Sequence, residues 1–445
     1  MNDLPGTGVS LFSRVTTSFR SNCDRYFPFR RHLIHAIGNV EFHCAIGQLV
    51  HNRTQCLGEQ RVSAKWNDCY LLAMSTMSST KAARTAAVAL AVVATAVGSW
   101  GALGGVSVAA PEGTTPLEYG QTRDVASVPG PGQPEGIAVD PQDGSVWAGS
   151  NRPYSSGTLW HWDSAGTLID TVPLAGHVPA EHGINGVTLD GDGRIYALDY
   201  SGSRAVRVDP ATGDQSVYAT FGDLPPCGGV PTQPCEPSIV DRPAWPNWAT
   251  FDEAGNLYVS DLNQATIWVV PPGGGAAQIW YQNPDFASIY SINGMQFDAA
   301  RRLTFGVTLS LAADIETIAR GSIYNIAVAP DGSPGELRRI AVTGLGDGLA
   351  IGASGRIYLA SSSPLDNSVQ VIDPNLGVMT DSIPHLPERY ARSIPYATPA
   401  SLGFRGTSLI LSNHGLFALD PRQYAILELG VGETGLALNY PRGLA

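Results

Sequence analysis

The chain has 445 residues, of which 43% are hydrophobic and 15% charged, and it contains 50 Gly and 32 Pro. That glycine and proline content is typical of many short strands joined by turns, not of a helical protein. Ten of the 27 Lys and Arg but only five of the 39 Asp and Glu lie in the first 110 residues, so the rest of the chain is strongly acidic. An acidic surface repels phosphate backbones and anionic lipid, so we expect no nucleic-acid partner. Both lysines, Lys65 and Lys81, precede residue 110, which excludes Schiff-base chemistry and a P-loop from the remainder.

An apolar stretch near residue 90 has the layout of a secretory signal. Basic residues at 81–84 precede the run TAAVALAVVATAV (85–97), and small residues follow at 107–109. Because a signal must begin a chain, we predict that translation starts at Met77 or Met74. Residues 1–76 are then a spurious or disordered extension, and 77–109 are a cleaved signal peptide. The mature protein is expected to be secreted, monomeric and free of the membrane.

A second interpretation of this stretch stays open. The uncharged residues 85–110 are long enough to cross a bilayer as an uncleaved anchor behind a cytoplasmic extension. The mature N-terminus distinguishes the two, because cleavage places it near Ala110.

From residue 134 onward a motif recurs about every 53 residues. Each copy has a short strand with alternating apolar residues, a Gly/Asp turn and a second apolar strand, which is the pattern of a β-hairpin. The six copies begin at Pro134, Ile184, Pro246, Ile292, Gly346 and Pro399. This period suits a four-stranded blade, so we predict an all-β, six-bladed β-propeller of four-stranded antiparallel blades over residues 110–445. Residues 122–128 are expected to close the ring as the outer strand of the last blade, and 311–318 are the one short helix candidate.

The second residue of each copy carries the candidate chemistry. These residues are Glu135, Asn185, Asn247, Asn293, Asp347 and Ala400. The inner strand of every blade begins beside the central channel, so equivalent side chains converge on one axis. Ca²⁺ takes about six to eight oxygen ligands of these types. The pattern therefore predicts a divalent-cation site at the mouth of the channel.

Asn-Gly is also a turn signal, so Asn185 and Asn293 have a second interpretation as turn or channel hydrogen-bonding residues. Against turns, the hairpin turn of each copy lies about seven residues later, and Asn247 is followed by Trp248 instead of glycine. The Asp-x-x-Gly elements such as 140–144 are predicted to be turns and nothing more.

The motif order resembles the senescence-marker-protein/gluconolactonase family and its relatives, the paraoxonases and diisopropyl-fluorophosphatase, over residues 120–435. The resemblance implies that Glu135, Asn247, Asn293 and Asp347 bind a catalytic Ca²⁺ or other divalent cation. It also implies that Asp347 acts as general base or nucleophile on a lactone or related ester, with the cation lowering the pKa of bound water.

Three more residues are candidates for substrate contacts. Asn185 is an extra polar residue in blade 2, His182 lies three residues before it, and Trp248 replaces the small residue that the family has after the third-blade Asn. A lone His is more often a surface or hydrogen-bonded residue. Packing in the core or in a loop is as good an interpretation for Trp245, Trp248 and Tyr290.

Cys227 and Cys235 lie in a Pro/Gly-rich loop and are predicted to form a local disulfide. A metal site is the weaker interpretation, because no Cys or His pair completes it. The chain has no G-x-S-x-G and no H-E-x-x-H motif.

Two other functions stay open. The short motifs EGIAVD and NLYVSD are shared with NHL-type propellers. A non-catalytic propeller that binds a peptide, a glycan or a cell-envelope component is therefore the alternative interpretation. A lyase or synthase is a third possibility, for which Glu135 and His182 are the available groups.

Overall fold

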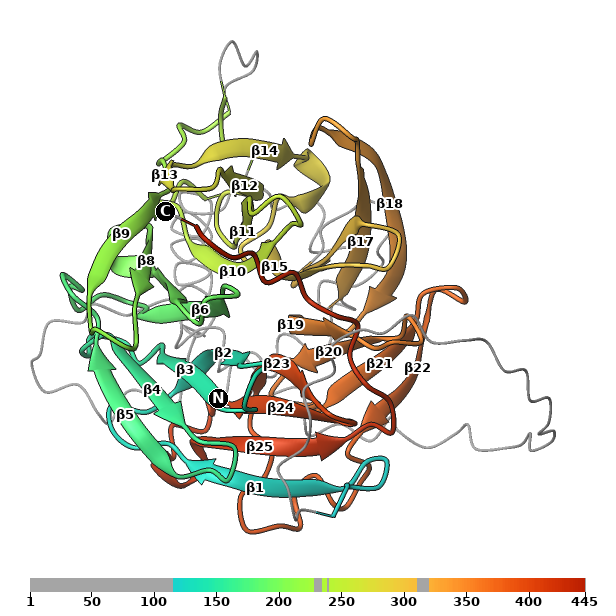
Figure 1. Cartoon of the computed structure of the whole chain (residues 1–445). Helices are drawn as coiled ribbons and strands as arrows, with labels where there is room; N and C mark the ends of the chain where they lie inside the picture. The colour runs from blue at the N-terminus through green and yellow to red at the C-terminus, as the bar shows by residue number, and fades with distance from the viewer. Residues whose placement is uncertain (1–114, 228–233, 238–239, 310–319, 445) are drawn as a thin grey trace, which may run out of the picture. The chain divides into compact units, whose positions relative to one another are not determined.

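The computed structural model describes residues 115–227, 234–237, 240–309 and 320–444, which belong to one compact unit, Trp100–Ala445. In these residues the chain forms six antiparallel sheets arranged around a central channel (Figure 1). The predicted six-bladed β-propeller is confirmed. Within this part of the chain, no helix has the length and apolarity needed to cross a membrane. The predicted signal peptide and the helix candidate at 311–318 lie outside the described residues.

Each of the first five blades runs outward from its inner strand in chain order. Blades 1 to 3 comprise β2 (Pro134–Val139), β3 (Val146–Ser150), β4 (Thr158–Trp162) and β5 (Leu168–Pro173); β6 (Ile184–Leu189), β7 (Ile195–Asp199), β8 (Arg204–Val208) and β9 (Gln215–Thr220), with the short β13 (Gly275–Ala276) parallel to β9; and β10 (Pro246–Phe251), β11 (Leu257–Asp261), β12 (Thr266–Val270) and β14 (Gln278–Gln282).

Blades 4 to 6 follow the same plan. Short 3-10 turns occur at η2 (Tyr200–Gly202) within blade 2, at η3 (Pro284–Phe286) between blades 3 and 4, and at η4 (Pro421–Gln423) within blade 6. The strands of blades 4 to 6 are β15 (Ile292–Phe297), β16 (Arg302–Val307), β17 (Gly321–Val328) and β18 (Pro334–Thr343); β19 (Gly346–Ile351), β20 (Ile357–Ser361), β21 (Val369–Asp373) and β22 (Val378–Ile383); and β23 (Pro399–Arg405), β24 (Ser408–Asn413), β25 (Ala425–Gly430) and β1 (Thr122–Ser127).

The ring closes through β1, which pairs antiparallel with β25 as the outer strand of blade 6, as the sequence predicted. A buried ion cluster reinforces this closure. Glu428 of β25 accepts hydrogen bonds from Arg123 of β1 (2.6 Å) and from Arg405 of β23 (2.9 Å). Arg405 also donates to the carbonyls of Gly144 and Ser164 in blade 1, so one guanidinium joins the last blade to the first.

The core consists of apolar layers between neighbouring blades. The alternating strands bury one face against each neighbour, and aromatic side chains contribute to several of these layers. Trp160 and Trp162 of blade 1, for example, pack with Ile410 and Ile426 of blade 6. Because each blade depends on its neighbours for burial, the closed ring is the unit that the hydrophobic effect stabilises.

A β-bulge occurs at the start of all six inner strands. In blade 1, Pro134 lies opposite Ser150 but Ile137 lies opposite Ala148, so the inner strand carries one extra residue, and the other five blades show the same slip. Bulges bend a strand and redirect its side chains, and they are frequent beside active sites. The bulge here spans the second residue of each repeat, which positions that residue at the channel mouth.

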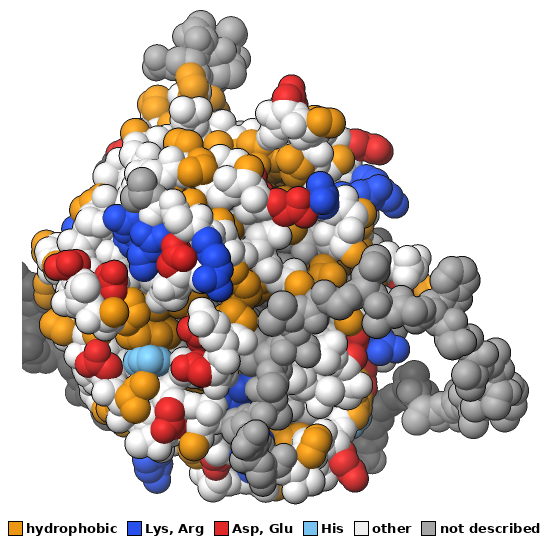
Figure 2. Space-filling model, viewed as in Figure 1, with side chains coloured by type: hydrophobic (Ala, Val, Ile, Leu, Met, Phe, Trp, Pro, Cys, Tyr) orange, Lys and Arg blue, Asp and Glu red, His pale blue; other side chains and the backbone are white. Residues whose placement is uncertain are grey.

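The C-terminal segment, residues 431–444, crosses the opposite face of the ring (Figure 1). The backbone N–H of Leu436 donates to the Ile351 carbonyl of blade 5 (2.8 Å), and the Asn439 amide donates to the Phe251 carbonyl of blade 3 (2.9 Å). Acidic and basic side chains lie side by side on this face (Figure 2). The segment therefore ties blades 5, 3 and 2 together at the ends of their inner strands.

Candidate metal centre at the channel mouth

The six repeat residues lie at equivalent places in the inner strands. Glu135, Asn185, Asn247 and Asn293 are nearly fully buried, Asp347 is half-buried, and Ala400 leaves the sixth position apolar. The first five are called the polar ring below. Asn185 and Asn293 are strand residues, so the interpretation of the Asn-Gly pairs as turns is wrong.

The glycines that follow the ring residues are explained by close packing between blades. A Cβ on Gly136 would collide with the Asn185 carbonyl, and a Cβ on Gly186 would collide with the Asn247 carbonyl. Neither glycine has a positive φ, so backbone freedom is not the reason for their presence. Glycine lets neighbouring inner strands approach closely enough for the polar ring to converge.

Glu135 is held by two donors on one of its oxygens. Its Oε2 accepts a hydrogen bond from Asn151 Nδ2 (3.2 Å) and lies 2.9 Å from His414 Nδ1, while neither donor uses Oε1. Burial alone would raise the pKa of Glu135, but the charge and hydrogen bond of His414, together with Asn151, hold that pKa below its ordinary value. Glu135 is thus a carboxylate that keeps one oxygen available to a ligand.

Asp347 behaves in the opposite way. Burial and the nearby charge of Glu135 raise the pKa of Asp347 well above its ordinary range, and a hydrogen bond from Asn293 offsets this only in part. The two carboxyl groups therefore interact across the channel mouth. Two carboxylates in a partly dehydrated space destabilise each other unless a positive charge lies between them.

The three amides of the polar ring have buried atoms without hydrogen-bond partners. Among the described residues, nothing bonds Asn185 Oδ1, Asn293 Oδ1 or Asn247 Nδ2. Asn293 uses its Nδ2 on Thr308 Oγ1 (3.0 Å), which turns its oxygen away from that partner. An unpaired buried amide atom costs about 1–3 kcal/mol, and a cation that takes amide oxygens would remove this cost. The O and N of an amide exchange by rotation, so Asn247 can also present its oxygen.

This donor set fits a hard divalent cation. Two carboxylates and three amides supply oxygen ligands only, which is the preference of Ca²⁺. The amides are necessary to the set, because the described residues contain no cluster of three His, Cys, Asp or Glu side chains that could hold an ion by themselves. The structure thus places Glu135, Asn185, Asn247, Asn293 and Asp347 at the same position of five inner strands, and Asp347 interacts with both Glu135 and Asn293. That they hold a cation stays a prediction.

His414 is a site residue that the sequence analysis missed. It directly follows β24, just as Asn151 directly follows β3 and Thr308 directly follows β16, and all three bond members of the polar ring. The first residue after the second strand of a blade thus reaches the mouth. The repeat alignment already contained this position, and extending the comparison to it would have identified His414.

His182 lies within electrostatic range of Glu135 and against an aromatic wall. Its ring centroid is 3.8 Å from that of Trp245 and 5.1 Å from that of Tyr200. Burial lowers the pKa of His182 to about 4, although the Glu135 charge acts in the other direction. His182 is therefore a neutral aromatic group beside the polar ring at neutral pH.

Trp248, the third predicted substrate contact, lies across the base of the polar ring. A Cβ on Gly348 of β19 would lie 2.5 Å and 2.7 Å from Cζ3 and Cη2 of its indole, so the ring reaches from blade 3 to blade 5. Gly348 directly follows Asp347. The indole is half-buried and forms a floor beneath the mouth.

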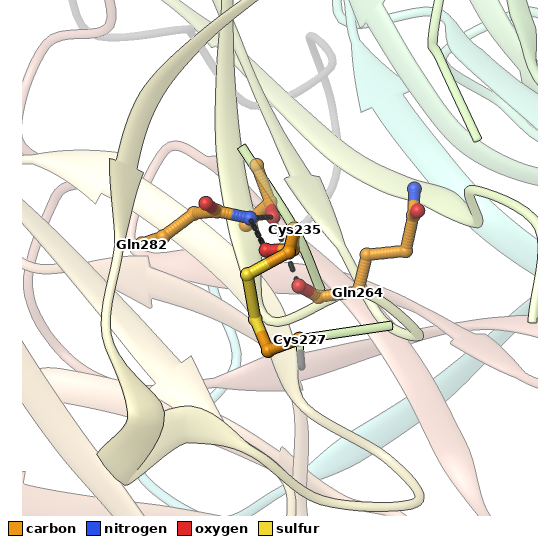
Figure 3. The surroundings of a disulfide bond; sticks show 5 residues. Cys227, Cys235, Gln264 and Gln282 are labelled. Atoms are coloured by element: carbon orange, nitrogen blue, oxygen red, sulfur yellow. Dashed lines mark hydrogen bonds between the residues drawn. A yellow bond between two sulfur atoms is a disulfide. The ribbon is translucent and has the colours of Figure 1, made fainter. Parts of the chain in front are cut away.

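The predicted disulfide between Cys227 and Cys235 is present, with a Cα–Cα distance of 4.9 Å, in the connection from blade 2 to blade 3. Blade 3 fixes this loop by side-chain bonds (Figure 3). Gln282 Nε2 donates to the Cys235 carbonyl (3.1 Å), and Gln264 accepts from the Leu224 N–H (2.6 Å). These contacts give the disulfide a structural role, and it contributes no atom to the polar ring.

No protein-family model matches the chain, and no curated protein does. Solved structures similar to it include a gluconolactonase from Xanthomonas campestris (16% identity, covering 73% of this chain and 93% of that one, TM-score 0.46) and the calcium-binding protein regucalcin from Agrobacterium tumefaciens (16%, 70% and 94%, 0.46). Virginiamycin B lyase from Staphylococcus aureus is another (14%, 70% and 99%, 0.46). At such identities and TM-scores, the activity of this chain has to be argued from its own residues.

Proposed function

We propose that this protein hydrolyses a lactone or related ester, using a divalent cation, Ca²⁺ by preference, held by the polar ring. One observation carries the proposal: two interacting carboxyl groups lie in the same ring of positions as three amides, each of which has one buried atom without a partner among the described residues. We place the activity outside the cytoplasm, because disulfides persist in oxidising compartments and the sequence carries a signal-like segment.

Glu135, Asn247, Asn293 and Asp347 would hold the cation, with Asn185 beside them. When bound, the cation would polarise the substrate carbonyl and lower the pKa of a water molecule. His414 and Asn151 orient Glu135 from behind, in the way that outer hydrogen bonds fix metal ligands.

Asp347 is the residue we assign to the proton transfer. It is the half-buried member of the polar ring, whereas the other four are nearly fully buried, so we assign the contact with an entering substrate to this most exposed member. It would accept the proton of the attacking water as general base. His182 and Trp245 would bind the apolar face of the substrate and exclude water from one side of the site.

The test is Asp347→Ala, assayed by acid release from δ-valerolactone and by calorimetric titration with Ca²⁺. We expect turnover to fall at least about a thousandfold, because the base is lost, and Ca²⁺ affinity to fall with the loss of one ligand charge. Asp285→Ala is the matched control, since Asp285 is an exposed carboxylate outside the ring, and it should change neither quantity. Ca²⁺ binding by the wild type without hydrolysis of any lactone or ester would instead support the non-catalytic propeller.

One observation favours a second candidate, a lyase that acts by elimination. Nε2 of His414 is buried and has no partner among the described residues, while Nδ1 lies against Glu135, so a second potential base lies beside the polar ring. The product distinguishes the two reactions, because hydrolysis adds the mass of one water and elimination leaves the total mass unchanged.

A further inference from the structure

A cavity of about 100 Å³, lined mainly by apolar residues, occupies the channel beneath the polar ring. It begins two residues further along the same inner strands, where each blade supplies an apolar side chain. The lining residues used below are Ile137, Val187, Met295, Leu349 and Leu402 at this level, together with Trp248, which lies one residue nearer the mouth. The channel thus changes within two residues from oxygen ligands to hydrocarbon.

The far end of this cavity is closed by the C-terminal segment. Leu436, Asn439 and Tyr440 line it there, and backbone and side-chain hydrogen bonds to Ile351 and Phe251 fix the segment in place. The segment therefore covers this end of the cavity.

The near end is closed by Trp248. At its level the other blades carry Gly136, Gly186, Gly294, Gly348 and Ser401, so the indole is the one bulky side chain. It reaches the Gly348 backbone on the other side of the channel and also lines the cavity. The indole consequently lies between the proposed cation ligands Asn247 and Asp347 above and the apolar space below.

We propose that Trp248 determines substrate specificity by separating the site from the apolar channel, so that the protein accepts lactones with compact rings and rejects those with long alkyl substituents. The inference rests on the proposed hydrolase. It predicts that removal of the indole turns the channel into an alkyl-binding subsite, since a dry apolar cavity accepts apolar groups of suitable size.

The experiment compares kcat/KM for δ-valerolactone and δ-decalactone, which differ only in an alkyl chain. Trp248→Gly introduces the residue that four other blades have, and it should raise the decalactone-to-valerolactone ratio at least about tenfold over the wild type, because each buried methylene contributes about fourfold. Trp248→Phe, which keeps a ring in the floor, should raise the ratio less and carries the test if the glycine variant does not fold.

Leu402→Ala is the matched control. It enlarges the same cavity but leaves the indole in place, so the ratio should remain that of the wild type. An unchanged ratio in both Trp248 variants, or an equal rise in Leu402→Ala, would overturn the inference.

A binding measurement separates this inference from the proposed reaction. If the wild type hydrolyses neither lactone, the hydrolase proposal fails, but the role of Trp248 can still be tested with 1-octanol by titration calorimetry on the full-length chain. The alcohol should bind Trp248→Gly at least about tenfold more tightly than the wild type, because only the variant admits its alkyl chain. Equal affinity for both proteins would refute the role of Trp248 as a barrier.

Discussion

The two ends of the central channel are formed by the same six inner strands, but they differ in how many of their polar groups have hydrogen-bond partners. At the mouth, the buried amide oxygens of Asn185 and Asn293 have no partner in the part of the chain that the structure describes, and two carboxyl groups lie within electrostatic range of each other. At the sealed end, Glu433 accepts hydrogen bonds from the Tyr358 hydroxyl (2.7 Å) and the Ser354 N–H (2.8 Å), and the Gly191 N–H donates to the Pro441 carbonyl (2.7 Å).

This difference separates a functional region from a structural one within a single fold. Proteins tend to violate local rules of polar satisfaction where they bind or catalyse, and the cost is offset elsewhere. The mouth is thus arranged for a ligand, and the sealed end stabilises the ring. Each prediction below changes one end of the channel and measures the stability of the protein, its binding of Ca²⁺, or both.

The largest effect is expected from deletion of residues 433–445, which unseals the channel. Leu444 and Tyr440 lose their buried positions, and the backbone bonds to blades 2 and 5 are broken. We expect the free energy of unfolding to fall by about 5 kcal/mol or more, from lost apolar burial and hydrogen bonds together. Denaturant unfolding measures this loss.

The comparison of the two ends requires that the same deletion spare the mouth. Calorimetric titration of the folded fraction should give a Ca²⁺ affinity close to that of the full chain, because no atom of the deleted segment bonds the polar ring. A large loss of affinity would show that the two ends are coupled.

The sequence predicted the mouth better than the sealed end, for a physical reason. All six expected starts of inner strands coincide with strand starts in the structure. They could be predicted because the same alternation of apolar residues recurs in the sequence of every blade. The C-terminal segment has no such period, and its path is determined by tertiary contacts such as that of Asn439 with Phe251. His414 was missed for a different reason, since its position directly after the second strand recurs in the repeats but was not compared between them.

The second prediction concerns pH and the buried imidazole of His182 at the mouth. Its pKa in the folded protein is about 4, against about 6.5 when unfolded, so the unfolded state binds more protons between these values. The stability associated with neutral His182 is therefore fully present above about pH 6.5 and is lost as the pH falls toward 4. His182→Phe should reduce by about 2 kcal/mol the free energy of unfolding that is lost as the pH falls through this window. This figure allows for the partial exposure of His182.

Urea unfolding of both proteins at several pH values between 4 and 7 tests the effect of His182. The wild type should lose stability more steeply than His182→Phe throughout this window. Parallel curves would mean that the imidazole is not kept neutral by burial, and that the aromatic wall formed with Trp245 is open to water.

The smallest expected effect concerns Asn185, the fifth member of the polar ring. Here the direction of the change in the free energy of unfolding is more informative than its size. Its Nδ2 makes only a 3.4 Å bond to the Gly183 carbonyl, and its Oδ1 has no partner among the described residues. Asn185→Leu should therefore increase the free energy of unfolding by about 1 kcal/mol in chelator, because an unpaired buried amide is replaced by an apolar group. The stabilisation that added Ca²⁺ gives should shrink at the same time.

Asn325→Leu supplies the matched control, because Asn325 of β17 is also buried with an unpaired Oδ1 but lies outside the polar ring. It should stabilise the protein to a similar extent and leave the Ca²⁺ response unchanged. If Asn185→Leu destabilises the protein in chelator, Asn185 is a packing residue. If it keeps the full response to Ca²⁺, the cation is held by four residues and not five. Asn185→Leu alone should both raise the free energy of unfolding in chelator and reduce the stabilisation by Ca²⁺. That result would establish that Asn185 lowers the stability of the metal-free protein and contributes to binding of the cation.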